Sequence, residues 1–247
     1  MKLINSKDAT QMGEKAAEIA AESLNEAIEK KGKARLLLAT GQSQLTTINA
    51  LVEKKVEWGK VEAFHLDEYV NLTKYHKASF RKYLEERFVE KVNLKKMHFV
   101  DGEGDVEENI KELTQRVRES VIDVALIGIG ENAHIAFNDP PADFETKEAY
   151  KEVQLDEYSR NQQVREGWFS TINQVPNTAI TMTVYQIMQS EKIISSVPYK
   201  VKANPVKLVL ESKIDNKVPA TILKKHHDWT LFLDEESSSL INTNDYQ

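Results

Sequence analysis

Residues 121–144, "VIDVALIGIGENAHIAFNDPPADF", decide the fold of this chain. The stretch begins as an apolar, β-branched run and ends among polar residues and prolines. A short apolar run that ends at a glycine turn is typical of a strand buried on both faces of a parallel sheet. The sequence therefore predicts a central strand over 121–130, which brings the polar segment around His134 to one edge of the sheet.

Helical and strand patterns alternate on both sides of this stretch. Such alternation predicts an α/β fold with a mostly parallel central sheet and helices on both faces, a Rossmann-like three-layer α/β/α arrangement. We expect one domain over residues 1–247, with the long polar stretch 141–177 as a candidate mobile flap. The expected strands are 34–40, 61–69, 96–100, 121–130, 178–184, 191–197 and 229–233, and the expected helices are 8–30, 43–53, 77–90, 105–119 and 200–212.

Composition excludes several classes of protein. The chain of 247 residues has no cysteine, so disulfides, thiolate nucleophiles and cysteine-ligated metals are excluded. Its net charge is −6 and its basic residues are dispersed, which disfavours nucleic-acid binding. The N-terminus lacks an apolar signal core, and no apolar run reaches the length of a membrane span. We expect a soluble, cytoplasmic protein with no membrane partner.

Three polar clusters follow predicted strands, where open parallel sheets bind their ligands. In the first, "TGQSQ", Gly41 permits a tight turn before a helix. The amides of Gln42 and Ser43 at that helix start would attract a phosphate, and the Thr40 and Ser43 hydroxyls would add contacts. The alternative is an ordinary strand–helix turn with Ser43 as a helix cap.

The other two clusters carry titratable groups. Asp67 ends the strand predicted over 61–69, a good position for a general base, although a solvated acidic turn is the alternative. His134 can move a proton near neutral pH, and Asp139 is near enough in sequence to orient it. Here the alternative is a histidine that is merely hydrogen-bonded in a loop.

In this order, five motifs resemble those of the glucosamine-6-phosphate deaminase/isomerase family. They are "TGQSQLTT", "FHLDEYVNL" followed by "HKASF", "IGIGENAHIAFNDP", "NQVPNTAITMT" and "VKANPVKLVLE", and together they span roughly 8–240. The family shares its fold with phosphogluconolactonases and phosphosugar-binding regulators, and "DEY" with "HIAFN.P" favours the deaminase branch. The resemblance implies aldose–ketose isomerisation of a hexosamine 6-phosphate with ammonia release, with no metal or organic cofactor.

The resemblance also assigns residues. Asp67 matches the base that moves a proton between C2 and C1 of the open-chain sugar. His134 matches the residue that helps to open the pyranose ring, and Asp139 matches a glutamate that works with it. The turn 40–43 and Lys202 match the phosphate-binding groups of the family, and Arg165 matches another of these groups after a one-residue shift. Further candidates near the substrate are Glu68, Ala133 and His76.

The chain departs from the family pattern next to the histidine. Asn132 occupies the position of a family aspartate, and an amide cannot carry the charge that stabilises an imidazolium. Ala133 replaces a glycine, and Asp139 is shorter than the family glutamate. Stretch 141–160 lacks the basic pattern of the family's allosteric site, so allosteric control is not carried over.

Three explanations of Asn132 stay open. In the first, Asp139 alone is sufficient for the same reaction. In the second, the substrate differs, as in isomerisation without deamination, and in the third a phosphosugar binds without turnover. A phosphosugar lactonase and a non-catalytic regulator also stay open, as does association of the chain with copies of itself. Residues 1–15 lead directly into the first helix, with no room for a DNA-binding helix pair, which argues against a transcription factor.

Overall fold

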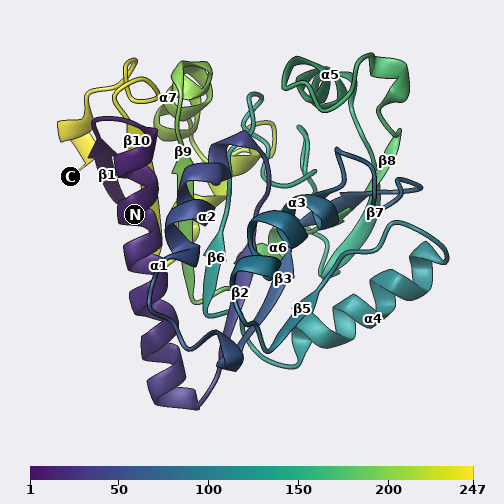
Figure 1. Ribbon diagram of the computed structural model, residues 1–247. Helices are drawn as coiled ribbons and strands as arrows, with labels where there is room; N and C mark the ends of the chain where they lie inside the picture. Colours follow the sequence, from purple (N-terminus) through teal and green to yellow (C-terminus); the bar gives the residue numbers. More distant parts are fainter. Residues whose placement is uncertain (247) are drawn as a thin grey trace.

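The computed structural model describes residues 1–246, and its core is a sheet of seven parallel strands (Figure 1). The strand order is β1-β10-β9-β6-β2-β3-β5, so β6 lies in the middle, as the stretch 121–130 predicts. Gln247, the last residue of the expected domain, lies outside the described residues. The strands are β1 (Lys2–Ser6), β2 (Ala34–Leu38), β3 (Val61–His65), β5 (Lys96–His98), β6 (Val124–Leu126), β9 (Lys192–Val197) and β10 (Trp229–Asp234).

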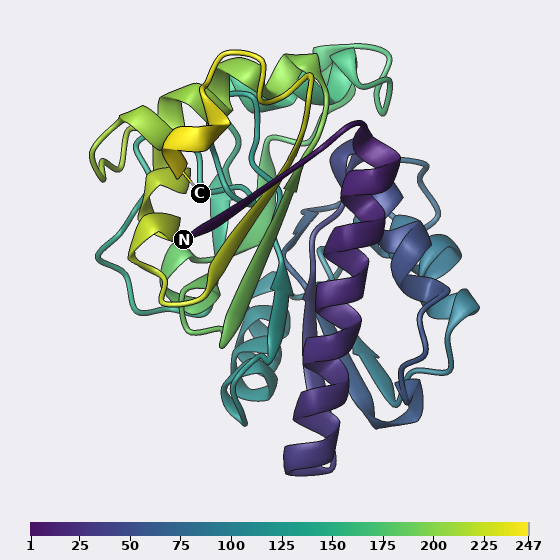
Figure 2. The same ribbon diagram turned by 90° about the vertical axis from the view of Figure 1, so that its left-hand side faces the viewer.

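Helices cover both faces of this sheet, which confirms the three-layer α/β/α prediction (Figure 2). Leu36 and Leu38 of β2 pack toward α1, α2 and α3, whereas Leu37 between them packs toward α4, α6 and α7. This alternation is the period of two of a strand buried on both faces. The helices are α1 (Ala9–Lys31), α2 (Leu45–Val52), α3 (Phe80–Arg87), α4 (Val106–Arg118), α6 (Val184–Ile187) and α7 (Ala203–Glu211).

A second, antiparallel sheet lies beside the first, in the order β4-β8-β7. It divides the single strand expected over 61–69, because β3 ends at His65 and β4 (Asp67–Tyr69) pairs with β8 (Thr178–Met182). The crossing point is Leu66, whose N–H donates to the carbonyl of Leu38 in the first sheet while its own carbonyl accepts from Met182 in the second. Asp67 therefore stands at the junction of the two sheets.

The polar segment 141–177 contains regular structure that its composition does not reveal. It holds β7 (Tyr150–Gln154), α5 (Glu157–Arg165) and a short 3-10 turn over Ile172–Gln174. Helix α5 lies beyond the carboxyl ends of the parallel strands, at the top of the view in Figure 1. Strand β1 was also not predicted, because "KLINS" is a mixed edge strand without a clear apolar run. Within residues 1–246, none of the helices combines the length and the apolar character needed to span a membrane.

Candidate active site

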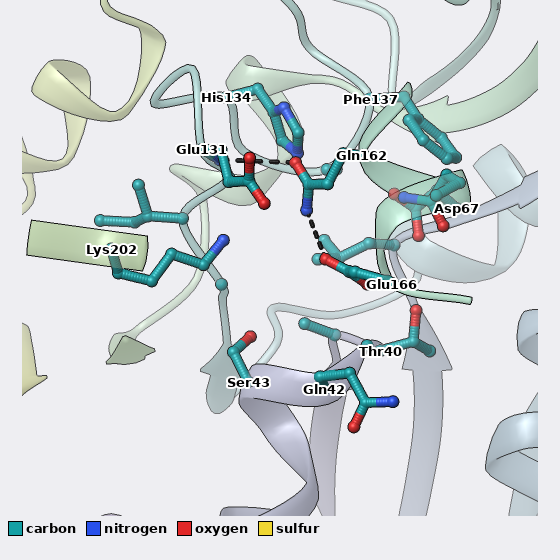
Figure 3. Close-up of a pocket in the computed structure, with 18 of the residues that line it drawn as sticks. Thr40, Gln42, Ser43, Asp67, Glu131, His134, Phe137, Gln162, Glu166 and Lys202 are labelled. Atoms are coloured by element: carbon teal, nitrogen blue, oxygen red, sulfur yellow. Dashed lines mark hydrogen bonds between the residues drawn. The ribbon is translucent and has the colours of Figure 1, made fainter. Parts of the chain in front are cut away.

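A cavity of about 180 Å³ opens at the carboxyl ends of the parallel strands (Figure 3). Its walls come from the turn after β2, the junction before β4, the loop after β6, helix α5 and the turn before α7. The cavity collects seven of the residues that the sequence predicts as site residues. These are Thr40, Gly41, Gln42, Ser43, Asp67, His134 and Lys202.

The turn after β2 forms one end of the cavity. Gly41 has φ 96°, in the left-handed region that favours glycine. A 3-10 turn, η1 (Gln42–Gln44), follows, and neither η1 nor α2 has a side-chain cap, so Ser43 is not a helix cap. The buried Gln44 Nε2 donates to Ser43 Oγ at 3.0 Å and to the Ser196 carbonyl at 3.1 Å. The uncapped N–H groups and the held Ser43 hydroxyl suit an anion.

Lys202 faces this turn from the end of a second 3-10 turn, η5 (Lys200–Lys202). The residue is 6% exposed, and Figure 3 shows its side chain extending into the cavity. Burial lowers the pKa of Lys202, against the opposing charges of Glu166 and Glu131. An anion bound beside the ammonium would favour its charged form, so this end of the cavity is built to hold one anionic group.

Asp67 lies across the cavity from Lys202 (Figure 3). It is 6% exposed, and its carboxylate reaches solvent through the cavity it lines. Burial and, less strongly, the charge of Glu68 raise the pKa of Asp67 well above its ordinary value. A carboxylate with a raised pKa is a stronger base than an exposed one, as a group that removes a proton from carbon requires.

Glu68 is turned away from the cavity. Its carboxylate accepts hydrogen bonds from Ser79 Oγ at 2.7 Å, the Arg81 N–H at 3.0 Å and the Tyr69 N–H at 2.9 Å. The Arg81 guanidinium lies 3.4 Å from it and also bonds to the carboxylates of Asp101 and Glu103. Glu68, a sequence candidate near the substrate, is thus not among the residues that line the cavity. Instead, Glu68 ties β4 to α3 behind Asp67.

His134 and Asp139 form the pair that the sequence predicts. His134 Nδ1 lies 3.2 Å from Asp139 Oδ1, which leaves Nε2 on the side of the ring near Gly130 and the cavity. Asp139 stands behind His134, outside the cavity lining. Burial opposes ionisation of Asp139, but hydrogen bonds from His134, Ser159 and Asn132 outweigh it and hold the pKa of Asp139 below its ordinary value. The negative charge facing the imidazole therefore comes from Asp139.

Asn132 supports this pair from behind rather than facing the cavity. Its Nδ2 donates to Asp139 Oδ1 at 3.3 Å, and its Oδ1 accepts from the His134 N–H at 3.2 Å. Gly130 makes room for the ring, since a methyl group there would lie no more than 2.5 Å from three imidazole atoms. Gly130 thus allows close packing of the chain against the His134 ring.

Three other candidates lie outside the cavity lining. Ala133 is fully buried with φ 64°, and its carbonyl accepts from the Ala220 N–H. Arg165 is half exposed and pairs with Glu131 at 2.6 Å, so the phosphate contact expected of it would require it to leave this ion pair. His76 stacks on Phe169 with ring centroids 5.3 Å apart.

Sequence reasoning missed much of the cavity wall. Gln162 and Glu166 join through a 2.7 Å hydrogen bond, and Glu166 also accepts from Trp168 Nε1 at 3.1 Å. Glu131, adjacent to Asn132, forms an ion pair with Arg165 and so does not take the place of the family aspartate beside His134. Helix α5 has no apolar stripe that would have revealed it. The missed lining residues with polar side-chain atoms are Glu131, Gln162, Gln163, Glu166, Trp168 and Tyr199.

Comparison with known proteins identifies the family of the chain. The family model described as "Glucosamine-6-phosphate isomerases/6-phosphogluconolactonase" matches residues 7–232. The chain belongs to this family. Glucosamine-6-phosphate deaminases from Thermoanaerobacter sp. (strain X514) and Shouchella clausii (strain KSM-K16) are both 34% identical to it, covering 99% and 97% of this chain and 97% of each relative.

Solved structures extend the comparison. A monomeric glucosamine-6-phosphate deaminase superposes with a TM-score of 0.90 at 30% identity, covering 98% of this chain and all of that one. The 6-phosphogluconolactonase from Trypanosoma brucei has a TM-score of 0.80 at 13% identity, with 98% of each chain covered. At that identity the lactonase shares the fold alone, whereas the deaminase also shares sequence over the whole length.

Proposed function

We propose that this family member is a hexosamine-6-phosphate deaminase. It converts a 2-amino-2-deoxyhexose 6-phosphate and water into a ketose 6-phosphate and ammonia. The observation that carries the proposal is that Asp67 and His134, which is backed by Asp139, line the same cavity as the uncapped turn 40–43 and Lys202. The full-length similarity to proteins named glucosamine-6-phosphate deaminase supports the same reaction.

The substrate's phosphate binds at the turn end of the cavity. The N–H groups of 41–43, the Thr40 and Ser43 hydroxyls and the Lys202 ammonium supply the donors. This contact is remote from the reacting carbons, so its binding energy positions C1 and C2 between Asp67 and His134. A charged sugar phosphate does not cross a bilayer unaided, and we therefore assign the protein to the cytoplasm.

Ring opening is the first chemical step. His134 Nε2 transfers the proton of the 1-hydroxyl to the ring oxygen, and the C1–O5 bond breaks to give the open-chain aldehyde. The contact of His134 Nδ1 with Asp139 fixes the imidazole orientation and stabilises the positive charge that it acquires in passing the proton. Asn132 is compatible with this step because Asp139 supplies the charge.

Isomerisation and deamination follow at C2. The Asp67 carboxylate removes the C2 proton while a proton of the substrate ammonium passes to O1, which gives a neutral enolamine. Asp67 then delivers its proton to C1, which leaves an iminium group at C2. Water adds to the iminium carbon, the C2–N bond breaks and ammonia leaves, which gives the ketose 6-phosphate. The raised pKa of Asp67 suits both directions of its proton transfer.

The test is incubation with glucosamine 6-phosphate in heavy water, with C2 proton exchange followed by NMR and ammonia by an enzymatic assay. We expect both signals, and loss of both in Asp67→Asn but not in Asp143→Asn, an exposed carboxylate outside the cavity. Exchange without ammonia would identify an isomerase instead. Binding without either signal, or hydrolysis of a phosphogluconolactone, would refute the deaminase.

A further inference from the structure

The N-terminus of α5 reaches the His134–Asp139 pair through one side chain, that of Ser159. Ser159 is 1% exposed, and its Oγ donates to Asp139 Oδ1 at 2.6 Å. The same Oγ lies 3.4 Å from His134 Nδ1. The Ser159 N–H is used separately, donating to the helix cap Asp156 at 2.6 Å. The Ser159 hydroxyl therefore bonds to the His134–Asp139 pair, whereas the Ser159 N–H belongs to the capping of helix α5.

We propose that Ser159 is a positioning residue for His134, acting through Asp139, and that it makes the proton-transfer pair depend on the docking of α5. The proposal rests on the proposed function. Ser159 thus supplies an orienting bond to Asp139 from helix α5, which lies in a different part of the chain from the loop that carries the pair.

The geometry around Asp139 carries the argument. Oδ1 receives three donors, from Ser159 at 2.6 Å, His134 at 3.2 Å and Asn132 at 3.3 Å. Oδ2 is buried without a hydrogen-bond partner among residues 1–246. Hydrogen bonds to one oxygen alone thus set the rotation of this carboxylate, and the Ser159 contact is the shortest. Without it, the carboxylate could turn its unpartnered oxygen toward a donor and lose the alignment with the imidazole.

Helix α5 also supplies part of the cavity wall, through Gln162 and Gln163, with Glu166 directly after its end. The Ser159 hydroxyl leads from the same helix to Asp139. A displacement of α5 would therefore remove the wall beside the substrate and release the support of His134 together. In this way the chain links substrate enclosure to ring opening through one hydroxyl.

The test compares Ser159→Ala, which removes only the hydroxyl, with Ser159→Thr, which keeps it. The control is Arg160→Ala at the next position of α5, which removes the bonds from Arg160 to the carbonyls of Ile172 and Val175 but leaves the Ser159 hydroxyl and its bond to Asp139 in place. We expect Ser159→Ala to lower kcat roughly ten- to hundredfold, the effect of a hydrogen bond to a charged acceptor, with KM changed less than about threefold. Ser159→Thr keeps kcat near the wild-type value, and Arg160→Ala, which lies outside the cavity lining, changes kcat less than about threefold.

A second measurement needs no substrate and stays decisive if the wild type releases no ammonia. The NMR signal of the His134 Nδ1–H, assigned with His134→Gln, reports the contact with Asp139 in the ligand-free protein. We expect this signal to move or broaden in Ser159→Ala and to stay in place in Arg160→Ala. An unchanged signal and unchanged kcat in Ser159→Ala, or equal effects in both variants, would overturn the proposal. Absence of ammonia in the wild type would instead refute the proposed function.

Discussion

Replacement of Gly130 by alanine tests whether the position of the His134 ring sets the rate. The added methyl group would stand no more than 2.5 Å from three atoms of the imidazole, where carbon contacts normally begin near 3.5 Å. The backbone of Gly130 is outside the left-handed region, so it accepts alanine without torsional strain. The substitution therefore acts by steric displacement, and the ring must move by about 1 Å or more.

A displacement of that size breaks the contact of His134 with Asp139, now 3.2 Å. Misplacement of a reacting group by about 1 Å costs on the order of 100-fold in rate, and overpacking costs about 1–3 kcal/mol of stability. We expect kcat for ammonia release from glucosamine 6-phosphate to fall about 100-fold in Gly130→Ala. Affinity for an open-chain amino-alditol 6-phosphate should change less than about threefold, because this ligand has no ring to open.

Gly128→Ala is the matched control. A methyl group there would lie 3.2 Å from Gln44 Nε2 and 3.6 Å from Ser43 Oγ, on the anion-binding turn rather than on His134. This variant should therefore raise KM and reduce phosphate inhibition while kcat changes little. Full kcat in a folded Gly130→Ala protein, or the same kcat loss in both variants, would refute the reasoning that His134 acts from its present position.

Three further predictions concern charge. Burial raises the pKa of Asp67, so its ionisation costs stability increasingly as pH rises above about 3.9 through the folded-state pKa. Asp67→Asn should therefore raise the free energy of unfolding at pH 7 by about 1–2 kcal/mol while abolishing activity. A lower thermal midpoint of the variant at pH 7 would contradict this. Arg81→Met leaves the Glu68 carboxylate buried without its cation and should lower the free energy of unfolding in urea by about 3–5 kcal/mol. A decrease below about 1 kcal/mol would show that stability does not depend on the ion pair. Lys202→Met should raise KM at least about tenfold, whereas Arg165→Met should raise KM less than about threefold. A tenfold rise in Arg165→Met would mean that Arg165 leaves Glu131 to bind the phosphate.

The sequence predicted the parts of the site that depend on local chain order. An apolar run followed by polar residues identifies a strand end, and the ends of parallel strands meet at one edge of a sheet. Gly41, Asp67 and His134 each follow such a run, and all three line the cavity. The residue types also predicted the chemistry, because a glycine turn at a strand end can bind an anion, a carboxylate can act as a base and an imidazole can transfer a proton.

The rest of the site was not predictable because it depends on where single side chains point. Helix α5 buries Ser159, Gln162 and Gln163, which are polar, so no apolar period marks it as a wall. Glu68 and Asp67 are adjacent in the sequence but leave opposite faces of β4, one toward Arg81 and the other into the cavity. No local pattern tells which of two neighbouring carboxylates will find a buried cation.

The sequence by itself determined the α/β architecture, the central position of β6 and the edge at which the site forms, because the apolar periodicity of each segment reflects how it is buried. Only the tertiary structure decided that the strand over 61–69 breaks at Leu66, that Asp139 takes the charged role beside His134, and that Ser159 joins them. These outcomes depend on hydrogen bonds between groups 5 to over 100 residues apart, and such bonds are satisfied in three dimensions rather than along the chain.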